Sequence, residues 1–218
     1  YPSAVREKKF KSVSTALMFG IQTDTDKYEH VTPIDIEALN YLSDYADREM
    51  INKINGIPMS PATMNYHARA LAARHLYKGW GIYGIGYAET GNRDSIAITA
   101  DLLLKNPDNK TVIVFALVED REKNDLYLDA SFRTRSGTLD LNGIIKKITS
   151  AGGARRFKGA YQIKLDYFRD CPDRDMLWKV CETTTIEKLK KARDDIYKRK
   201  IGSAFISAVK KISSFFRK

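Results

Sequence analysis

The alternation of hydrophobic and polar positions changes several times along the chain and predicts four strands. Residues 80–90 and 124–135 alternate apolar and polar side chains, as strands with one buried face do. Residues 111–120 form a nearly continuous β-branched run, which is typical of a fully buried strand. The short polar segment between 111–120 and 124–135 predicts a hairpin. Residues 159–168 alternate again and predict a fourth strand.

Helical periodicity fills the intervals between these strands. A helix over residues 33–46 begins with Thr32 as its cap and Pro33 as its first residue. An apolar run at residues 14–21 predicts a buried helix or a buried strand. Further helices are predicted at residues 61–77 after Ser60, at 93–105 after the capping residue Asn92, at 139–151 with Gly152 ending it, and from about 173 onward.

The order of these elements predicts the fold class. From residue 80 onward the order is β-α-β-β-α-β, followed by helices. The simplest architecture is an α/β (α+β) fold in which one mixed β-sheet has helices packed on it. The break at residues 54–60 is the best domain boundary. We therefore expect three parts, at residues 1–55, 56–180 and 181–218.

Composition agrees with a folded chain. The 218 residues are 43% hydrophobic and 29% charged, which excludes a disordered protein. Cys171 and Cys181 are too few for a disulfide framework and match no metal-binding spacing. A reducing cytoplasm is the expected compartment. No apolar run approaches the length of a membrane span, and residues 1–12 lack the apolar segment of a secretory signal.

Charge is unevenly distributed along the chain. The net charge is +10, and residues 182–218 hold eleven Lys and Arg against four Asp and Glu. This pattern predicts a basic C-terminal tail rather than a uniformly basic surface. Apolar residues of the last eighteen positions fall on one helical face. The tail either packs on its own domain, which is the preferred interpretation, or contacts a membrane surface or a partner.

Two acidic residues in the stretch GIQTDTDK, residues 20–27, are candidate metal ligands. Asp24 and Asp26 directly follow an apolar segment that is expected to be buried. Carboxylate oxygens are the ligands that hard divalent metals prefer. The alternative is an ordinary turn or helix cap.

Two arginines in the stretch SFRTRSG are candidate anion ligands. In a strand, Arg133 and Arg135 point to the same face. Two neighbouring guanidiniums can clamp a phosphate or a carboxylate. The alternative is a pair of solvated arginines.

A third candidate lies in the stretch TSAGGARRFKGAYQIKL. Gly152 and Gly153 precede Arg155, Arg156 and Lys158. Glycines at this place normally end a helix. They also let an anion approach the backbone closely, where N–H groups and side chains such as Arg155 hold it.

Together these motifs give the chain a resemblance to a known family. Residues 131–165 resemble the DHH-associated C-terminal domain of DHH phosphoesterases, which include nanoRNases, RecJ-like nucleases and exopolyphosphatase-related proteins. That domain has an S-x-R strand end, a helix, a G-G-G-H loop and a small-residue run. Its matches here are Ser131-Phe132-Arg133, Gly152-Gly153-Ala154-Arg155 and Gly159-Ala160. GIQTDT is similar to the last metal-ligand motif of the catalytic DHH domain, so the resemblance spans about residues 12–168.

The resemblance implies a hydrolase with a two-metal centre, usually of manganese, that cleaves phosphodiester or phosphoanhydride bonds. Its substrates would be short oligonucleotides, single-stranded DNA, 3′-phosphoadenosine-5′-phosphate, cyclic dinucleotides or polyphosphate, and a homodimer would be compatible with it. It implies that Asp24 is a metal ligand. The implied phosphate ligands are Arg133, Arg155, Gly152 and Gly153, with Arg135 and Lys158 as weaker candidates, and Phe132, Phe157 or Tyr161 could stack on a base.

Two departures from the family pattern limit these expectations. Arg155 replaces the family histidine, and the chain has no D-H-H motif. His67 and His75 are expected to be structural residues of the helix at 61–77. We expect a C-terminal part of such a phosphoesterase, inactive by itself. The alternatives are a non-catalytic module that binds nucleotides or single-stranded nucleic acid with the same arginines, and an unrelated α/β domain.

Overall fold

A computed structural model describes the backbone of residues 10–215 and the side chains of residues 10–198. The chain divides into two compact units, residues 1–59 and residues 60–218. This division falls inside the predicted break at residues 54–60.

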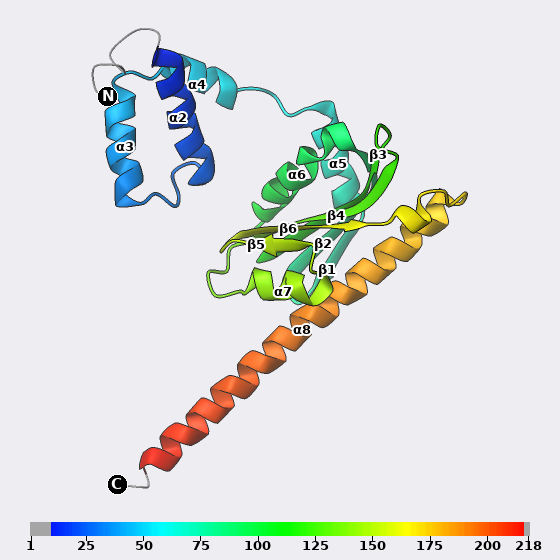
Figure 1. Cartoon of the computed structure of the whole chain (residues 1–218). Coiled ribbons are helices and arrows are strands. Elements are labelled where there is room, and N and C mark those ends of the chain that lie inside the picture. The colour runs from blue at the N-terminus through cyan, green and yellow to red at the C-terminus, as the bar shows by residue number, and fades with distance from the viewer. Residues whose placement is uncertain (1–9, 216–218) are drawn as a thin grey trace. The chain divides into compact units, whose positions relative to one another are not determined.

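The first unit is helical. Its helices are α2 (Lys11–Asp24), α3 (Pro33–Ser43) and α4 (Arg48–Asn55) (Figure 1). The apolar run at residues 14–21 is therefore helical rather than extended. The predicted start of α3 is confirmed, because the Thr32 hydroxyl accepts a hydrogen bond from the Asp35 backbone and the Asp35 carboxylate accepts one from the Thr32 backbone. The α4 helix, capped by Asp47, was not predicted.

A six-stranded mixed sheet organises the second unit, which confirms the predicted fold class. The strand order is β1-β2-β3-β4-β6-β5. Only the β2–β3 pair is parallel, and all other neighbours are antiparallel. The strands are β1 (Arg74–Tyr77), β2 (Trp80–Glu89), β3 (Thr111–Asp120), β4 (Asp125–Thr134), β5 (Gly152–Ala154) and β6 (Lys158–Lys164).

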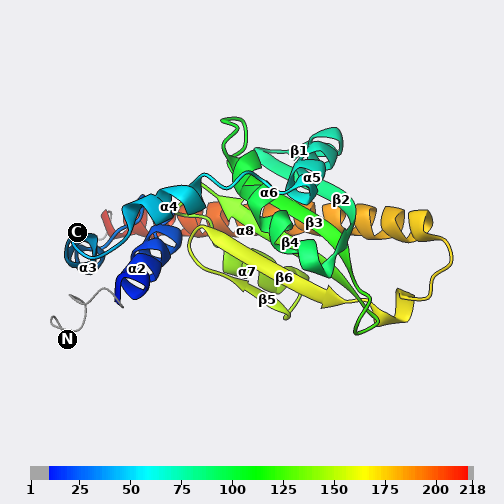
Figure 2. The same cartoon turned by 90° about the horizontal axis from the view of Figure 1, so that it is seen from above.

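Helices cover both faces of this sheet. The helices α5 (Pro61–Ala72) and α6 (Asp94–Leu104) lie on one face, and α7 (Leu141–Ile148) and α8 (Arg174–Phe215) lie on the other (Figures 1 and 2). Single 3-10 turns, η2 (Thr90–Asn92) and η3 (Asp166–Phe168), follow β2 and β6. The parallel β2–β3 pair needs a crossover connection, and α6 supplies it.

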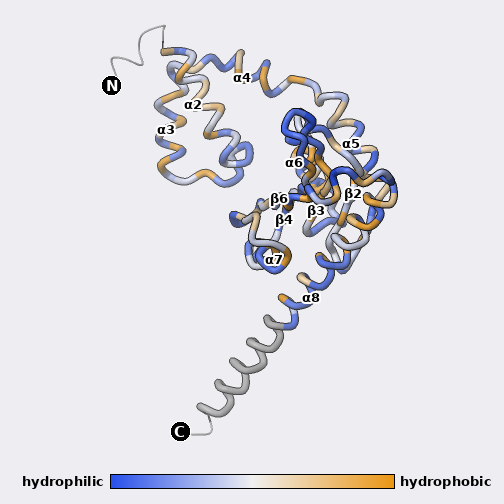
Figure 3. Tube along the Cα trace, turned by 45° about the vertical axis from the view of Figure 1, so that its right-hand side comes forward, coloured by the Kyte–Doolittle hydropathy of each residue, from blue (hydrophilic) through white to orange (hydrophobic). Residues whose placement is uncertain are grey.

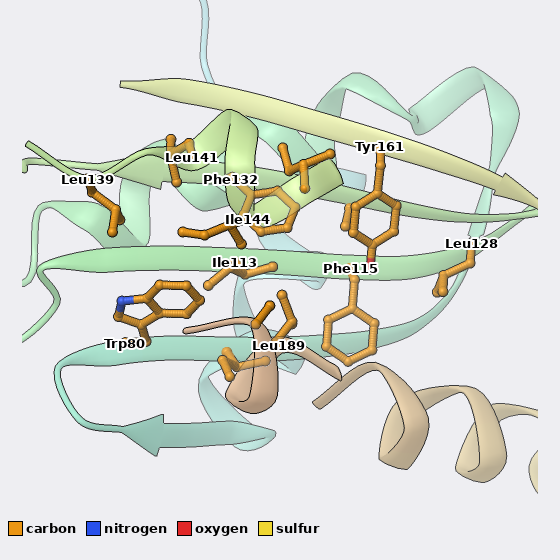
Figure 4. Close-up of a cluster of buried hydrophobic side chains, with 14 of the residues drawn as sticks. Trp80, Ile113, Phe115, Leu128, Phe132, Leu139, Leu141, Ile144, Tyr161 and Leu189 are labelled. Atoms are coloured by element: carbon orange, nitrogen blue, oxygen red, sulfur yellow. The ribbon is translucent and has the colours of Figure 1, made fainter. Parts of the chain in front are cut away.

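Two hydrophobic clusters hold these layers together. Between the sheet and α7 and α8, fully buried side chains such as Phe115, Phe132 and Ile144 interlock with Leu189 (Figure 4). On the opposite face, Val112 and Val114 of β3 belong to the second cluster with residues of α5 and α6. Figure 3 shows the hydrophobic residues gathered in the central strands. The apolar run at residues 111–120 is thus buried on both faces, as expected.

Two helix boundaries differ from the sequence-based prediction. The helix that begins after Ser60 ends at Ala72, and the next residues form strand β1. His75 therefore lies in an edge strand, while His67 lies in α5 as expected. Asn92 does not cap α6, because Arg93 occupies the capping position without a side-chain hydrogen bond.

The C-terminal half also differs in detail. The α7 helix ends at Ile148, and Gly152 begins strand β5 instead of capping the helix. The α8 helix is continuous, so the predicted boundary at residue 181 falls inside it. The apolar face predicted for the last eighteen residues lies outside the described side chains. Within the described part of the chain, no helix is long and apolar enough to cross a membrane.

Candidate functional site

A row of small residues, exposed at Ala160, crosses three strands of the sheet. Ser131 of β4, Ala160 of β6 and Gly153 of β5 are register partners, so their Cβ positions share one face. Ala160 is exposed, although β6 lies between two other strands. We call these three residues the open row. The sheet is therefore exposed at the middle residue of this row, Ala160.

Polar residues border the open row on both sides. Arg133 pairs with Lys158 in one neighbouring row, and Asp129 pairs with Gln162 in the other. Because side chains alternate along a strand, all four share the face of the open row. This is the face on which α6 packs, since Arg133 contacts Asp101 of α6.

A groove lies between α6 and the open row. Its volume is about 200 Å³, and we call it the α6 groove. In Figure 2, α6 lies over β3 and β4, and β6 is the next strand beyond β4. The groove is lined by Arg93, Asp94, Ile96 and Ala97 from the start of α6 and by Asp129, Ala130, Ser131, Ala160 and Tyr161 from the sheet.

Arg133, the first predicted phosphate ligand, is held by neighbouring groups. Its Nε lies 2.5 Å from Oδ1 of Asp101, and its Nη2 lies 3.2 Å from Oδ2 of the same carboxylate. Nη1 donates to the hydroxyl of Ser131 and to the carbonyl of Phe132, both at 3.0 Å. These bonds engage four of the five guanidinium hydrogens. The guanidinium is therefore fixed in orientation, and Asp101 offsets part of its charge.

Arg135 lies just beyond the end of β4. Its Nη2 donates a short hydrogen bond to the carbonyl of Leu104, the last residue of α6. A cation at this end of a helix interacts favourably with the helix dipole. Arg133 and Arg135 therefore do reach the same side of the sheet, as predicted, but separate groups on α6 engage them.

The two predicted glycines differ in their surroundings. A Cβ atom at Gly152 would lie 2.5 Å from Cβ of Tyr161 and 2.6 Å from the carbonyl oxygen of Ala160. Packing between β5 and β6 therefore requires glycine there. At Gly153 the nearest atom would be the side-chain oxygen of Asn142, at an ordinary 3.5 Å. Close approach of a ligand thus concerns Gly153 rather than Gly152.

The other predicted cations lie at the turn between β5 and β6. The backbone N–H of Arg155 donates to the carbonyl of Lys158 at 2.8 Å, which closes the turn. The Arg155 side chain is exposed, and Lys158 is half-buried opposite Arg133. The structure therefore brings Arg133, Lys158 and Gly153 to one surface, with Arg155 at its end.

The prediction that Phe132 and Tyr161 could stack on a base is wrong, because both side chains are buried. Phe132 and Tyr161 are buried on the opposite face of the sheet, with ring centroids 5.6 Å apart (Figure 4). A ligand on the open row cannot reach either ring face. Phe157 is half-buried, and the Arg156 guanidinium lies 5.1 Å from its ring centroid.

Sequence reasoning missed an ion pair in the α6 groove between a buried carboxylate and an exposed arginine. The carboxylate of Asp129, whose side chain is only 6% exposed, makes a short contact with Nε of Arg93. Burial raises the pKa of Asp129 above its ordinary value, and the charge of Arg93 counteracts part of this rise. A charged residue between the apolar positions Leu128 and Ala130 was the available signal. Its partner Arg93, the residue between η2 and α6, could not be predicted from local sequence.

Asp24, the predicted metal ligand, is the exposed last residue of α2 in the first unit. The following Asp26, Lys27 and Tyr28 adopt positive φ angles of 57°, 58° and 72°, so the stretch forms a left-handed turn. Among the described residues, no group of three or more His, Cys, Asp or Glu side chains could hold a metal ion. The described residues therefore do not fit a two-metal centre, and no metal-dependent step follows from them.

Comparisons with known proteins give distant similarities. No protein-family model matches the chain. The chain is 33% identical over 181 residues to an uncharacterized protein of Methanocaldococcus jannaschii, in an alignment that covers 82% of this chain and 36% of the relative. The chain thus spans about a third of the length of that curated relative.

Two solved structures align with parts of the chain. An exopolyphosphatase-related protein from Bacteroides fragilis matches with a TM-score of 0.48 at 12% identity, over 78% of this chain and 49% of that one. A pGpG-specific phosphodiesterase from Vibrio cholerae matches with a TM-score of 0.33 at 16% identity, over 71% of this chain and 50% of that one.

Proposed function

We propose that this chain supplies the substrate-binding surface of a phosphoesterase that hydrolyses phosphodiester or phosphoanhydride bonds. The observation that carries the proposal is the open row, which is uncovered at Ala160 and bordered by Arg133 and Lys158. Small side chains let an anionic group approach the strand backbone, and the two cations attract it. The row also coincides with the three motif positions that resemble the DHH-associated domain.

Asp101 has two opposed effects on phosphate binding at Arg133. Asp101 fixes the guanidinium of Arg133, so little side-chain entropy is lost when a ligand binds. Asp101 also cancels part of the positive charge, so net attraction depends on Lys158 and on Arg155 at the turn. We therefore expect binding to weaken with added salt, because Lys158 is only half-buried and Arg155 is exposed.

The proposed ligand is a phosphorylated small molecule or a short oligonucleotide. The isolated chain would bind it without cleavage, because the described residues offer no metal site. Manganese belongs to the proposal only through a centre that other residues would complete, with Asp24 as one candidate ligand.

Fluorescence anisotropy with a labelled 5′-phosphorylated dinucleotide tests the proposal, with cleavage recorded in the same tube in the presence of Mn²⁺. Ala160→Leu fills the open row and should weaken binding by about tenfold or more. Ala68→Leu is the matched control, because Ala68 is an exposed alanine on α5. Lys158→Gln should weaken binding and reduce its salt dependence.

Three results would contradict the proposal. The unaltered chain could fail to bind the dinucleotide, or Ala160→Leu could bind as tightly as Ala68→Leu. Cleavage by the isolated chain would show that it contains a catalytic centre, formed by residues to which the proposal gives no catalytic role.

A further inference from the structure

A second depression lies where the parallel strands β2 and β3 both end, with Glu89 and Glu119 side by side in register. In open α/β sheets, ligands commonly bind at the carboxyl ends of parallel strands. The depression has a volume of about 340 Å³, and we call it the β2–β3 pocket. Its lining includes Tyr66, Tyr87, Glu89, Asn92, Glu119 and Arg121. Arg133 pairs with Val112 near the start of β3, so the pocket and Arg133 lie at opposite ends of that strand.

One wall of the pocket is fixed and carries no net charge. The carboxylate of Glu119 forms a short ion pair with the guanidinium of Arg174. That guanidinium also lies 4.4 Å from the centroid of the Tyr87 ring, and the Tyr87 hydroxyl donates to the carbonyl of Arg174 at 2.8 Å. Glu119 is therefore neutralised within the fold and leaves the binding of a ligand to the other polar residues of the pocket.

Two opposite charges of the pocket have no partner. Glu89 and Arg121 are exposed and line the same pocket. Neither side chain makes an ion pair or a hydrogen bond with any residue whose side chain the structure describes, and they do not contact each other. A free carboxylate and a free guanidinium thus face one small volume.

The acidic residues near Arg121 do not neutralise it. Arg121 also borders a neighbouring depression that contains several carboxylates. Each of these carboxylates has a cationic partner of its own: Glu119 with Arg174, Asp120 with Lys123, Asp125 with Lys164 and Asp170 with Arg169. The guanidinium of Arg121 therefore remains available to a ligand.

We propose that the β2–β3 pocket binds a free α-amino acid, whose ammonium group pairs with Glu89 and whose carboxylate pairs with Arg121. An α-amino acid carries both charges at neutral pH, and hydrogen bonds between charged groups are the strong ones. Asn65 and Asn92 also line the pocket, and their amides can donate to or accept from the same two groups. The site is separate from the open row and does not depend on the proposed function.

The remaining lining of the pocket favours an apolar side chain on this amino acid. Ala62 and Ala88 contribute methyl groups, and Tyr66 and Tyr87 contribute aromatic rings. Small-molecule sites have volumes of about 300–1,000 Å³ and combine apolar walls with a few polar groups. The β2–β3 pocket has both properties.

An NMR titration of the isotope-labelled 218-residue chain with L-leucine tests the proposal. Two analogues each lack one charge: isopentylamine has no carboxylate, and isocaproate has no ammonium group. We expect L-leucine to shift the side-chain amide signals of Asn65 and Asn92. It should bind about tenfold more tightly than either analogue, because only L-leucine engages both charges.

Two variants test the two charges separately. Glu89→Gln should weaken L-leucine binding by about tenfold and leave isocaproate binding unchanged. Arg121→Gln should weaken L-leucine binding to a similar extent and leave isopentylamine binding unchanged. Glu122→Gln is the matched control, because Glu122 is exposed beside Arg121 in the sequence but does not line the pocket. It should leave all three affinities nearly unchanged.

Three results would overturn the proposal. L-leucine at about 10 mM could shift neither amide signal of the unaltered chain. One of the analogues could bind as tightly as L-leucine does. Finally, Glu89→Gln and Arg121→Gln could weaken L-leucine binding no more than Glu122→Gln does. Binding of the dinucleotide to the open row is measured separately, so none of these results decides the proposed function.

Discussion

The two faces of strand β4 differ sharply, although they share one backbone. On the side of α7 and α8, Phe132 is fully buried among apolar side chains. On the side of α6, Asp129, Ser131 and Arg133 are tied to one another or to charged partners. A few ångströms away on that same side, Ala160 is exposed.

The two faces differ in role: one packs against the core, and the other carries the proposed ligand site. A face that only stabilises the fold is best filled with apolar side chains, because buried polar groups must recover their lost hydration through hydrogen bonds. The α6 side instead retains two ion pairs beside an uncovered sheet surface. The buried carboxylate of Asp129 is held at a cost in free energy, as its raised pKa indicates, and the proposed ligand site lies beside it. Substitutions on the two faces should therefore have opposite signatures.

The largest expected effect is the loss of packing at Phe132. Phe132→Ala should lower the free energy of unfolding by about 3–5 kcal/mol, because it leaves a cavity in the main core. Ser131→Ala, its neighbour on the other face, removes one hydrogen bond to Arg133 and should cost about 1 kcal/mol. Urea denaturation followed by circular dichroism measures both. Equal losses from the two variants would erase the proposed contrast between the faces.

The two adjacent glycines give the next largest contrast. Gly152→Ala places a methyl group against backbone atoms of Ala160 and Tyr161 that cannot move aside, so it should cost about 1–3 kcal/mol. Gly153→Ala meets only an ordinary contact and should change stability little. The order should reverse for ligands, since only Gly153 belongs to the open row. Melting temperatures and dinucleotide affinities of both variants test this, and a greater loss of stability in Gly153→Ala would contradict it.

Local sequence predicted the elements whose pattern of buried and exposed side chains is set by their own residues. The hairpin of β3 and β4 and the capping box at Thr32 are specified by neighbouring residues, and both were found as expected. Strands β1 and β5 are short, and their stability comes from pairing with β2 and β6, which no local pattern reveals. That pairing converted the end of a predicted helix into a strand.

The candidate site was predictable only in part, for the same reason. The arginines were recognised because of their residue type and their place in the motif, and Arg133 does border the open row. The partner of Arg133 is Asp101 in α6, and the partner of Asp129 is Arg93 at the start of α6. Each partner lies about 30 residues away in sequence. Gly152 was predicted as a phosphate ligand because local sequence does not reveal its contact with Tyr161. That contact depends on the register of β5 and β6.

The smallest expected effect is the pH dependence of stability that arises from Asp129. Burial raises the pKa of Asp129, so its contribution to stability is fully present below the pKa of the unfolded chain and is lost as the pH rises through the higher folded value. Asp129→Asn cannot ionise. Its free energy of unfolding minus that of the unaltered chain should therefore become more positive as the pH rises through this window.

Asp125, four residues earlier on β4, provides a control of opposite sign. Hydrogen bonds from Tyr127 and then Lys164 lower the pKa of Asp125, so its contribution is present above the unfolded value and is lost as the pH falls. The difference for Asp125→Asn should become more negative as the pH rises. Denaturation curves between about pH 3 and 7 measure both differences. Parallel curves for the two variants would mean that burial does not raise the pKa of Asp129 in the folded chain.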